Sequence, residues 1–149
     1  MDDKDFMLEA LAQAKKAENA GEMPVGCVIV KDGRIIARGH NEREISHDPT
    51  AHAEIVAIRR AAEALGSWRL NGCALYVTLE PCPMCAGAIV QSRVEKLVFG
   101  AYDDAAGCAG SVYRITEDPA FNHFCKAEGG IMECECKAMI DEFFAGKRE

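Results

Sequence analysis

Two short motifs hold the residues of this sequence that are best suited to metal chemistry. His52-Ala53-Glu54 begins one predicted helix, and Pro81-Cys82-Pro83-Met84-Cys85 begins another. Two thiolates one helical turn apart can bind a single Zn²⁺, and an imidazole adds a third ligand. The fourth tetrahedral position then stays open to water, which is the arrangement of a catalytic rather than a structural zinc site.

Glu54 is better suited to proton transfer than to metal binding. Because His52 and Glu54 are two residues apart, both can address one metal only if it lies off the end of the helix. A hard carboxylate is a poor fourth ligand beside two soft thiolates, whereas a carboxylate that hydrogen-bonds the water can move protons. We therefore predict that His52, Cys82 and Cys85 bind one Zn²⁺ and that Glu54 is the general acid and base.

A closed structural zinc site is the alternative to this open site. It needs a fourth protein ligand, which one of four further cysteines could supply: Cys108, Cys125, Cys134 or Cys136. The spacing of Cys134 and Cys136 does not suit one helical face. Cys27 and Cys73 lie in or beside apolar strand runs, where a thiol usually packs as a small hydrophobic side chain.

Hydrophobic periodicity predicts the elements that must position these motifs. Helices are predicted over 6–20, 51–65, 81–91 and 133–145. Strands are predicted over 25–30, 35–37, 75–79 and 97–99, with a polar loop over 40–49 and a weak strand over 124–127. Because strand and helix alternate after residue 75, we expect an α/β fold with crossovers onto a shared sheet. With 49% apolar content in 149 residues, the chain is expected to form a single domain over 1–149.

Charge limits the kinds of partner. The formal net charge of −7 argues against general electrostatic binding of nucleic acid, which needs clustered Lys and Arg. Any RNA site must therefore be a local patch. The first residues are acidic rather than a cationic leader, and no apolar stretch approaches membrane-spanning length. We expect a soluble, cytoplasmic protein without a membrane partner.

The two motifs together resemble the signature of the cytidine and deoxycytidylate deaminase superfamily. The stretches His47–Glu54, Leu75–Cys82 and Met84–Ala88 look like those of the bacterial transfer-RNA-specific adenosine deaminases, and the resemblance spans almost the whole chain. It implies a three-layer α/β/α fold with a central mixed sheet of about five strands, one Zn²⁺ per subunit and a homodimer. The implied reaction converts the wobble adenosine of a tRNA anticodon loop to inosine by hydrolytic deamination.

The same resemblance implies substrate-binding roles for residues around the zinc motifs. Asn41 would hydrogen-bond the flipped base, and Asp103 would contact the ribose-phosphate beside it. The Pro81 carbonyl would orient the leaving amine, and Ala53 belongs to the same substrate-binding set. The simpler interpretations are a turn residue for Asn41 and a loop cap for Asp103.

One of two adjacent aromatic residues near the C-terminus is expected to reach the anticodon loop. Adjacent helical side chains point about 100° apart. Of Phe143 and Phe144, we therefore expect one to pack inward and Phe144 to meet the RNA. Gly146 is expected to end the helix, and Lys147 and Arg148 would add cations next to the rings. Ordinary helix packing is the alternative for both rings.

Two other functions are compatible with the zinc motifs. A deaminase of a free nucleobase, nucleoside or nucleotide, of the guanine or cytidine type, would use the same metal chemistry. A non-catalytic zinc-binding interaction module would bind the metal as well, but it has no use for a carboxylate such as Glu54 beside an open metal position.

Overall fold

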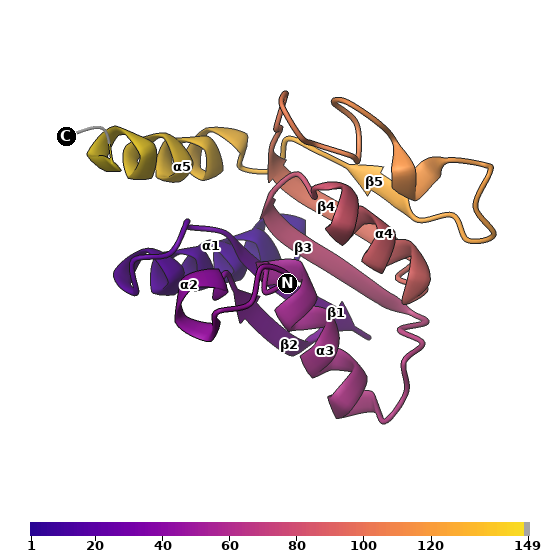
Figure 1. The fold of residues 1–149 in the computed structure, drawn as a ribbon. Helices are drawn as coiled ribbons and strands as arrows, with labels where there is room; N and C mark the ends of the chain where they lie inside the picture. The colour runs from indigo at the N-terminus through magenta and orange to yellow at the C-terminus, as the bar shows by residue number, and fades with distance from the viewer. Residues whose placement is uncertain (148–149) are drawn as a thin grey trace.

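The protein is described by a computed structural model that covers residues 1–147, with side chains to Gly146. At its centre is a mixed sheet in the order β2-β1-β3-β4-β5 (Figure 1). The strands are β1 (Gly26–Lys31), β2 (Arg34–His40), β3 (Cys73–Leu79), β4 (Lys96–Ala101) and β5 (Lys126–Glu128). β1 pairs antiparallel with β2 and β3, whereas β3, β4 and β5 run parallel to one another.

Helices cover both faces of this sheet. They are α1 (Asp3–Asn19), α2 (Arg43–Ser46), α3 (Ala53–Leu65), α4 (Pro83–Gln91), the 3₁₀ helix η1 (Ile115–Glu117) and α5 (Glu133–Lys147). Alternate residues of β1 point to opposite faces, so Val28 packs in the core with α1 while Ile29 packs in the core with α3 and α4. The predicted three-layer α/β/α architecture and its five-stranded mixed sheet are confirmed.

Local patterns located most elements to within a few residues, but two short helices were not predicted. The expected polar loop over 40–49 contains α2, and η1 lies in the irregular segment before β5. The α2 turn depends on a distant side chain, because the buried carboxylate of Glu22 accepts the backbone N–H groups of Glu44 and Ile45 at 3.1 and 2.8 Å. Periodicity cannot reveal a contact of this kind.

The expected end of the last helix was also wrong. α5 runs through Gly146 to Lys147, since Gly146 keeps helical backbone. Gly66, by contrast, does end α3 with a left-handed φ of 65°. Within the part of the chain that the structure describes, every helix is too short or too polar to cross a membrane.

Candidate active site

The two sequence motifs meet at the N-termini of α3 and α4. His52 is the N-cap residue of α3 and Cys82 is the N-cap residue of α4, and both have extended backbone. Pro83 occupies the first helical position of α4, where its fixed φ suits the helix and its missing N–H costs nothing. Cys85 lies one turn further along, fully buried. The two helix starts therefore present their side chains to the same point.

The three predicted ligands lie at distances that suit a tetrahedral zinc ion. Nδ1 of His52 is 3.6 Å from Sγ of Cys82 and 3.5 Å from Sγ of Cys85. Ordinary Zn–N and Zn–S bonds at a tetrahedral angle place such atoms roughly 3.6 Å apart. All three donor atoms lie within 4.8 Å of one another. The residues present therefore fit one Zn²⁺.

The alternative of a closed zinc site finds no support in residues 1–147. No fourth His, Cys, Asp or Glu of these residues joins the group of three donors. Cys108 is buried and its Sγ donates to the backbone oxygen of Ala106. Cys125 and Cys136 are buried as free thiols, and Cys134 is exposed. The described site has three protein ligands, as a catalytic zinc site does.

The pKa values of the two thiols are shifted in opposite directions. The pKa of Cys82 falls to about 4, because Cys85 and then His52 hydrogen-bond its sulfur and stabilise the thiolate. The same hydrogen bond raises the pKa of Cys85, and burial raises it further. At neutral pH one thiolate is thus already present to begin metal binding.

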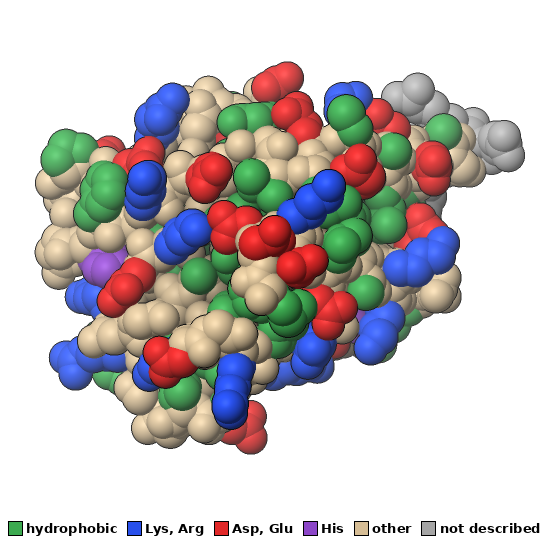
Figure 2. All heavy atoms as spheres, turned by 180° about the vertical axis from the view of Figure 1, so that it is seen from behind, with side chains coloured by type: hydrophobic (Ala, Val, Ile, Leu, Met, Phe, Trp, Pro, Cys, Tyr) green, Lys and Arg blue, Asp and Glu red, His purple; other side chains and the backbone are tan. Residues whose placement is uncertain are grey.

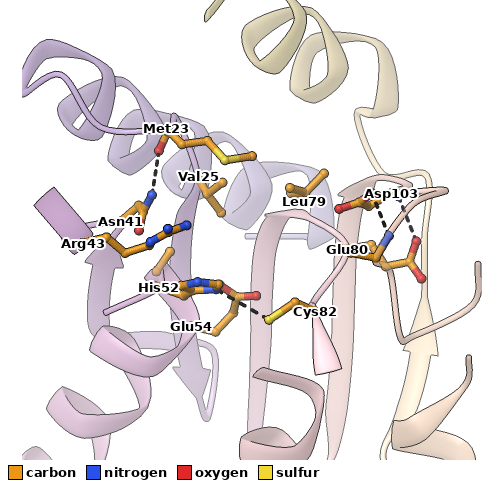
Figure 3. Close-up of a pocket in the computed structure, with 12 residues that line it drawn as sticks. Met23, Val25, Asn41, Arg43, His52, Glu54, Leu79, Glu80, Cys82 and Asp103 are labelled. Carbon is orange, nitrogen blue, oxygen red and sulfur yellow. Dashed lines mark hydrogen bonds between the residues drawn. The ribbon is translucent and has the colours of Figure 1, made fainter. Parts of the chain in front are cut away.

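Glu54 is a buried carboxyl group beside these ligands. It lies in the first turn of α3 with 4% of its surface exposed. Burial is the main reason that its pKa rises to about 7, and the thiolate of Cys82 raises it further. Figure 3 shows Glu54 next to His52, on the side that faces Cys82. This position suits proton transfer at the metal site rather than a role on the protein surface.

A pocket of about 190 Å³ opens over the metal site. Its floor is formed by the two sequence motifs, and its lining is mostly apolar. Figure 3 shows Asn41 and Arg43 on one wall and Glu80 and Asp103 on the opposite wall. Met23 also lines the pocket. The site is therefore a hollow of small-molecule width with polar groups on two sides.

The predicted substrate-binding residues are only partly brought together. Asn41, Ala53 and Asp103 line the pocket. Phe144 lies outside it, in an adjoining hollow with Asn41 and Arg43. Pro81 does not line the pocket, and its carbonyl accepts the backbone N–H of Cys108 at 2.8 Å.

Asn41 and Asp103 differ in how their polar atoms are used. Nδ2 of Asn41 donates to the backbone oxygen of Met23 at 3.5 Å, but its buried Oδ1 has no hydrogen-bond partner in the described structure. Oδ1 of Asp103 accepts the N–H groups of Ala105 and Ala106 at 3.1 and 3.2 Å, which is the loop-cap arrangement. A buried polar atom usually has a hydrogen-bond partner. The unpaired Oδ1 of Asn41 is therefore available to accept a hydrogen bond from a bound molecule.

Two buried glutamates beside the pocket were missed by the sequence reasoning. Glu22 and Glu80 are 1% and 2% exposed, and each carboxylate accepts backbone N–H groups of a pocket wall. One signal was available, because Glu80 ends an apolar strand directly before Pro81. An acidic residue in a run that must be buried needs hydrogen-bond partners.

The fold and the site define a zinc-dependent hydrolytic deaminase. The chain belongs to the cytidine and deoxycytidylate deaminase family, whose zinc-binding region matches residues 1–101. A tRNA-specific adenosine deaminase of Bacillus subtilis is 52% identical over 147 residues, which cover 99% of this chain and 91% of that protein.

Two solved structures add to this comparison. One comes from structural studies of A-to-I editing by tRNA:A34 deaminases; it has a TM-score of 0.87 and 46% identity, and covers 90% of this chain and 97% of that chain. A guanine deaminase of Bacillus subtilis reaches a TM-score of 0.66 at 47% identity, over 68% of this chain and 66% of that one. The similarity to the wobble-editing structure is therefore the more extensive of the two.

We predict that Cys85→Ala largely loses zinc, because two remaining donors bind the ion far more weakly than three. Metal analysis of the purified protein, with the parent expected to hold about one Zn²⁺ per chain, measures this. Cys108→Ala is the matched control, since it removes a buried thiol that is not among the three donors. Equal zinc content in Cys85→Ala and the control would refute the ligand assignment.

Proposed function

We propose that this protein deaminates the wobble adenosine of a tRNA anticodon loop to inosine. The observation that carries the proposal is the pocket, which places the unpartnered acceptor of Asn41 and the buried carboxyl of Glu54 around the three zinc ligands. The relatives named as tRNA-specific adenosine deaminases support the choice of substrate.

In this proposal Glu54 moves the protons of the reaction. His52, Cys82 and Cys85 would hold a Zn²⁺ ion, which would act as a Lewis acid and make water a nucleophile at neutral pH. Water adds at C6 of adenine, and Glu54 takes its first proton and passes it to ring N1. Glu54 then carries the second water proton to the amine, so that ammonia leaves and C6 becomes a carbonyl. Water is consumed and the products are inosine and ammonia.

The two walls of the pocket would hold the nucleotide. Oδ1 of Asn41 can accept a hydrogen bond from the base, which would satisfy its buried acceptor. Asp103 lies on the opposite wall and would face the ribose. An anticodon loop is single-stranded, so extruding its base costs less than opening a duplex.

The adjoining hollow would hold the neighbouring part of the loop. It is lined by Arg43 and by Phe143 and Phe144, whose rings meet edge-on at 5.5 Å between centroids. Phe144 is 43% exposed and Phe143 is less exposed, as expected from their helical spacing. The side chain of Lys147 and all of Arg148 lie outside the described residues. Acidic and basic side chains are interspersed over the face in Figure 2, so a local site agrees better with this surface than broad phosphate contact.

The proposed enzyme acts as a cytoplasmic homodimer. The family resemblance supports the dimer, and exposed aromatic side chains in the segment between β4 and β5 offer apolar surface for a subunit contact. The two most exposed of them are Tyr113 and Phe124, at 66% and 60%. Light scattering of the purified protein would give the mass of the assembly.

Deamination of a free base is the second candidate function, because the guanine deaminase structure shares 47% identity with part of this chain. We predict that an anticodon stem-loop with adenosine at the wobble position is converted to inosine, whereas guanine is not turned over at a comparable kcat/KM. Ammonia release from both substrates measures this. Faster turnover of guanine would overturn the proposal, and no ammonia from either substrate would favour a non-catalytic module.

We predict that Glu54→Gln keeps its zinc but loses deamination by at least the ~10²–10⁴-fold typical of a general acid and base. The amide preserves the shape of the side chain but cannot accept and return protons. Inosine formation and zinc content should be measured on the same protein. Glu63→Gln is the matched control, because Glu63 is an exposed residue of the same helix. A Glu54→Gln variant as active as this control would remove Glu54 from the mechanism.

We predict different salt dependences for two changes in the adjoining hollow. Phe144→Ala should lower stem-loop affinity without changing the slope of log K against log salt, because a stacking ring carries no charge. Arg43→Gln should reduce that slope by about one, since one phosphate contact is lost. Trp68→Ala, at an exposed aromatic residue between α3 and β3, is the control for the first change. Unchanged binding by both variants would place the RNA elsewhere.

A further inference from the structure

One carboxylate organises an entire wall of the pocket. Glu80 follows the last residue of β3 and is almost fully buried. Its Oε1 accepts the backbone N–H of Asp103 at 3.0 Å and the hydroxyl of Ser111. Its Oε2 accepts the backbone N–H groups of Ala109 and Ser111 at 3.0 and 2.8 Å. All four donors belong to one loop, residues 102–111, which we call the wall loop.

The wall loop is packed directly against this carboxylate. A Cβ atom on Gly107 would lie 2.3 Å from Cδ of Glu80 and 2.6 Å from the backbone oxygen of Asp103, so only glycine fits there. The N–H of Cys108 also bonds the carbonyl of Pro81, the residue after Glu80. The wall loop is thus tied to the strand end at two adjacent residues.

The charge of Glu80 is stabilised by this loop alone. Among the described residues it forms no ion pair, so its partners are three peptide N–H groups and one hydroxyl. Hydrogen bonds to a buried charged group are stronger than neutral ones and are costly to leave unmade. Because the loop has little regular structure, these bonds and the bond from Cys108 to Pro81 restrain where Asp103 and Ala106 lie.

We propose that Glu80 is a positioning residue for nucleotide binding, acting through the wall loop. It fixes Asp103 and Ala106, which line the pocket, and Figure 3 shows Asp103 on the wall opposite Asn41. Both carboxylate oxygens of Glu80 already accept hydrogen bonds from the wall loop, so Glu80 does not take part in proton transfer. This inference rests on the proposed function for its substrate, but the restraint on the loop is a property of the chain itself.

Glu22 provides a matched control on the opposite wall. It is equally buried, and its carboxylate accepts the N–H groups of Glu44 and Ile45 in α2, next to Arg43. Glu22→Gln therefore removes a buried charge and weakens hydrogen bonds to backbone N–H groups, as Glu80→Gln does. The Glu22→Gln variant leaves the hydrogen bonds of the wall loop, which carries Asp103, unchanged.

Glu80→Gln is the sharpest test, because the amide can keep only part of the network. If its carbonyl oxygen takes the place of Oε2, the bonds from Ala109 and Ser111 survive and the NH₂ group faces the N–H of Asp103. We expect KM for the anticodon stem-loop to rise about tenfold, the effect of losing one hydrogen bond to a charged group. We expect kcat to change less than twofold and zinc to stay at one per chain, since the helix starts of α3 and α4 are not altered.

A double-mutant cycle separates positioning from general destabilisation. In an Asp103→Ala background, Glu80→Gln should raise KM by much less than in the parent, because the Asp103 carboxylate that Glu80 positions is absent and only Ala106 remains to be held. Glu22→Gln should raise KM by the same factor in both backgrounds. Additive effects of Glu80→Gln and Asp103→Ala would overturn the proposal. So would zinc loss or a fall in kcat with unchanged KM in Glu80→Gln, because Glu80 would then act on the metal site.

Amide hydrogen exchange tests the same restraint without any substrate. The N–H of Asp103 should exchange at least tenfold faster in Glu80→Gln than in the parent and in Glu22→Gln. Unchanged exchange at Asp103 would overturn the proposal. A parent chain that does not deaminate the stem-loop would refute the proposed function, and exchange at Asp103 would still decide the role of Glu80. Should Glu80→Gln not fold, Gly107→Ala displaces the loop from Glu80, and the same changes in KM and exchange are expected.

Discussion

The short distances between the imidazole of His52 and the thiols of Cys82 and Cys85 constrain the rest of the structure. His52 and Cys82 are 30 residues apart in the sequence, yet Nδ1 of His52 lies 3.6 Å from Sγ of Cys82. This requires the N-termini of α3 and α4 to meet at the same end of the sheet. Both helices pack on the same face in one apolar cluster, which includes Ala57 and Ile89. Hydrophobic packing thus determines the geometry of the metal donors, and the helix N-termini favour the thiolate.

Above this centre, the pocket walls are irregular backbone that needs a different kind of support. An irregular loop satisfies only part of its buried N–H groups by itself, so the remaining partners must come from elsewhere in the chain. In this protein the partners are carboxylates: Glu22 for the turn that carries Arg43, and Glu80 for the loop that carries Asp103. The reacting centre is therefore held by apolar packing, whereas the surfaces that would contact substrate are held by buried charge.

This division explains what the sequence could and could not predict. The three candidate zinc ligands, which the structure brings together, and Glu54 could be proposed because each lies in a motif whose spacing is local, and the main helices and strands follow from periodicity. The α2 turn and the roles of Glu22 and Glu80 were not found, because each depends on residues about 20 to 30 positions away. The end of α5 was placed wrongly because a glycine permits, but does not require, the left-handed conformation that ends a helix.

The buried carboxylates that hold the pocket walls also affect how a chain with a net charge of −7 could accept an RNA nucleotide. Negative charge near a phosphate is costly, most of all where water is excluded. Glu22 and Glu80 direct their carboxylates at backbone N–H groups. The charges of these two buried residues are thus compensated by the chain itself. An exposed cation, Arg43, lies at the rim, where a phosphate would remain while the base alone enters.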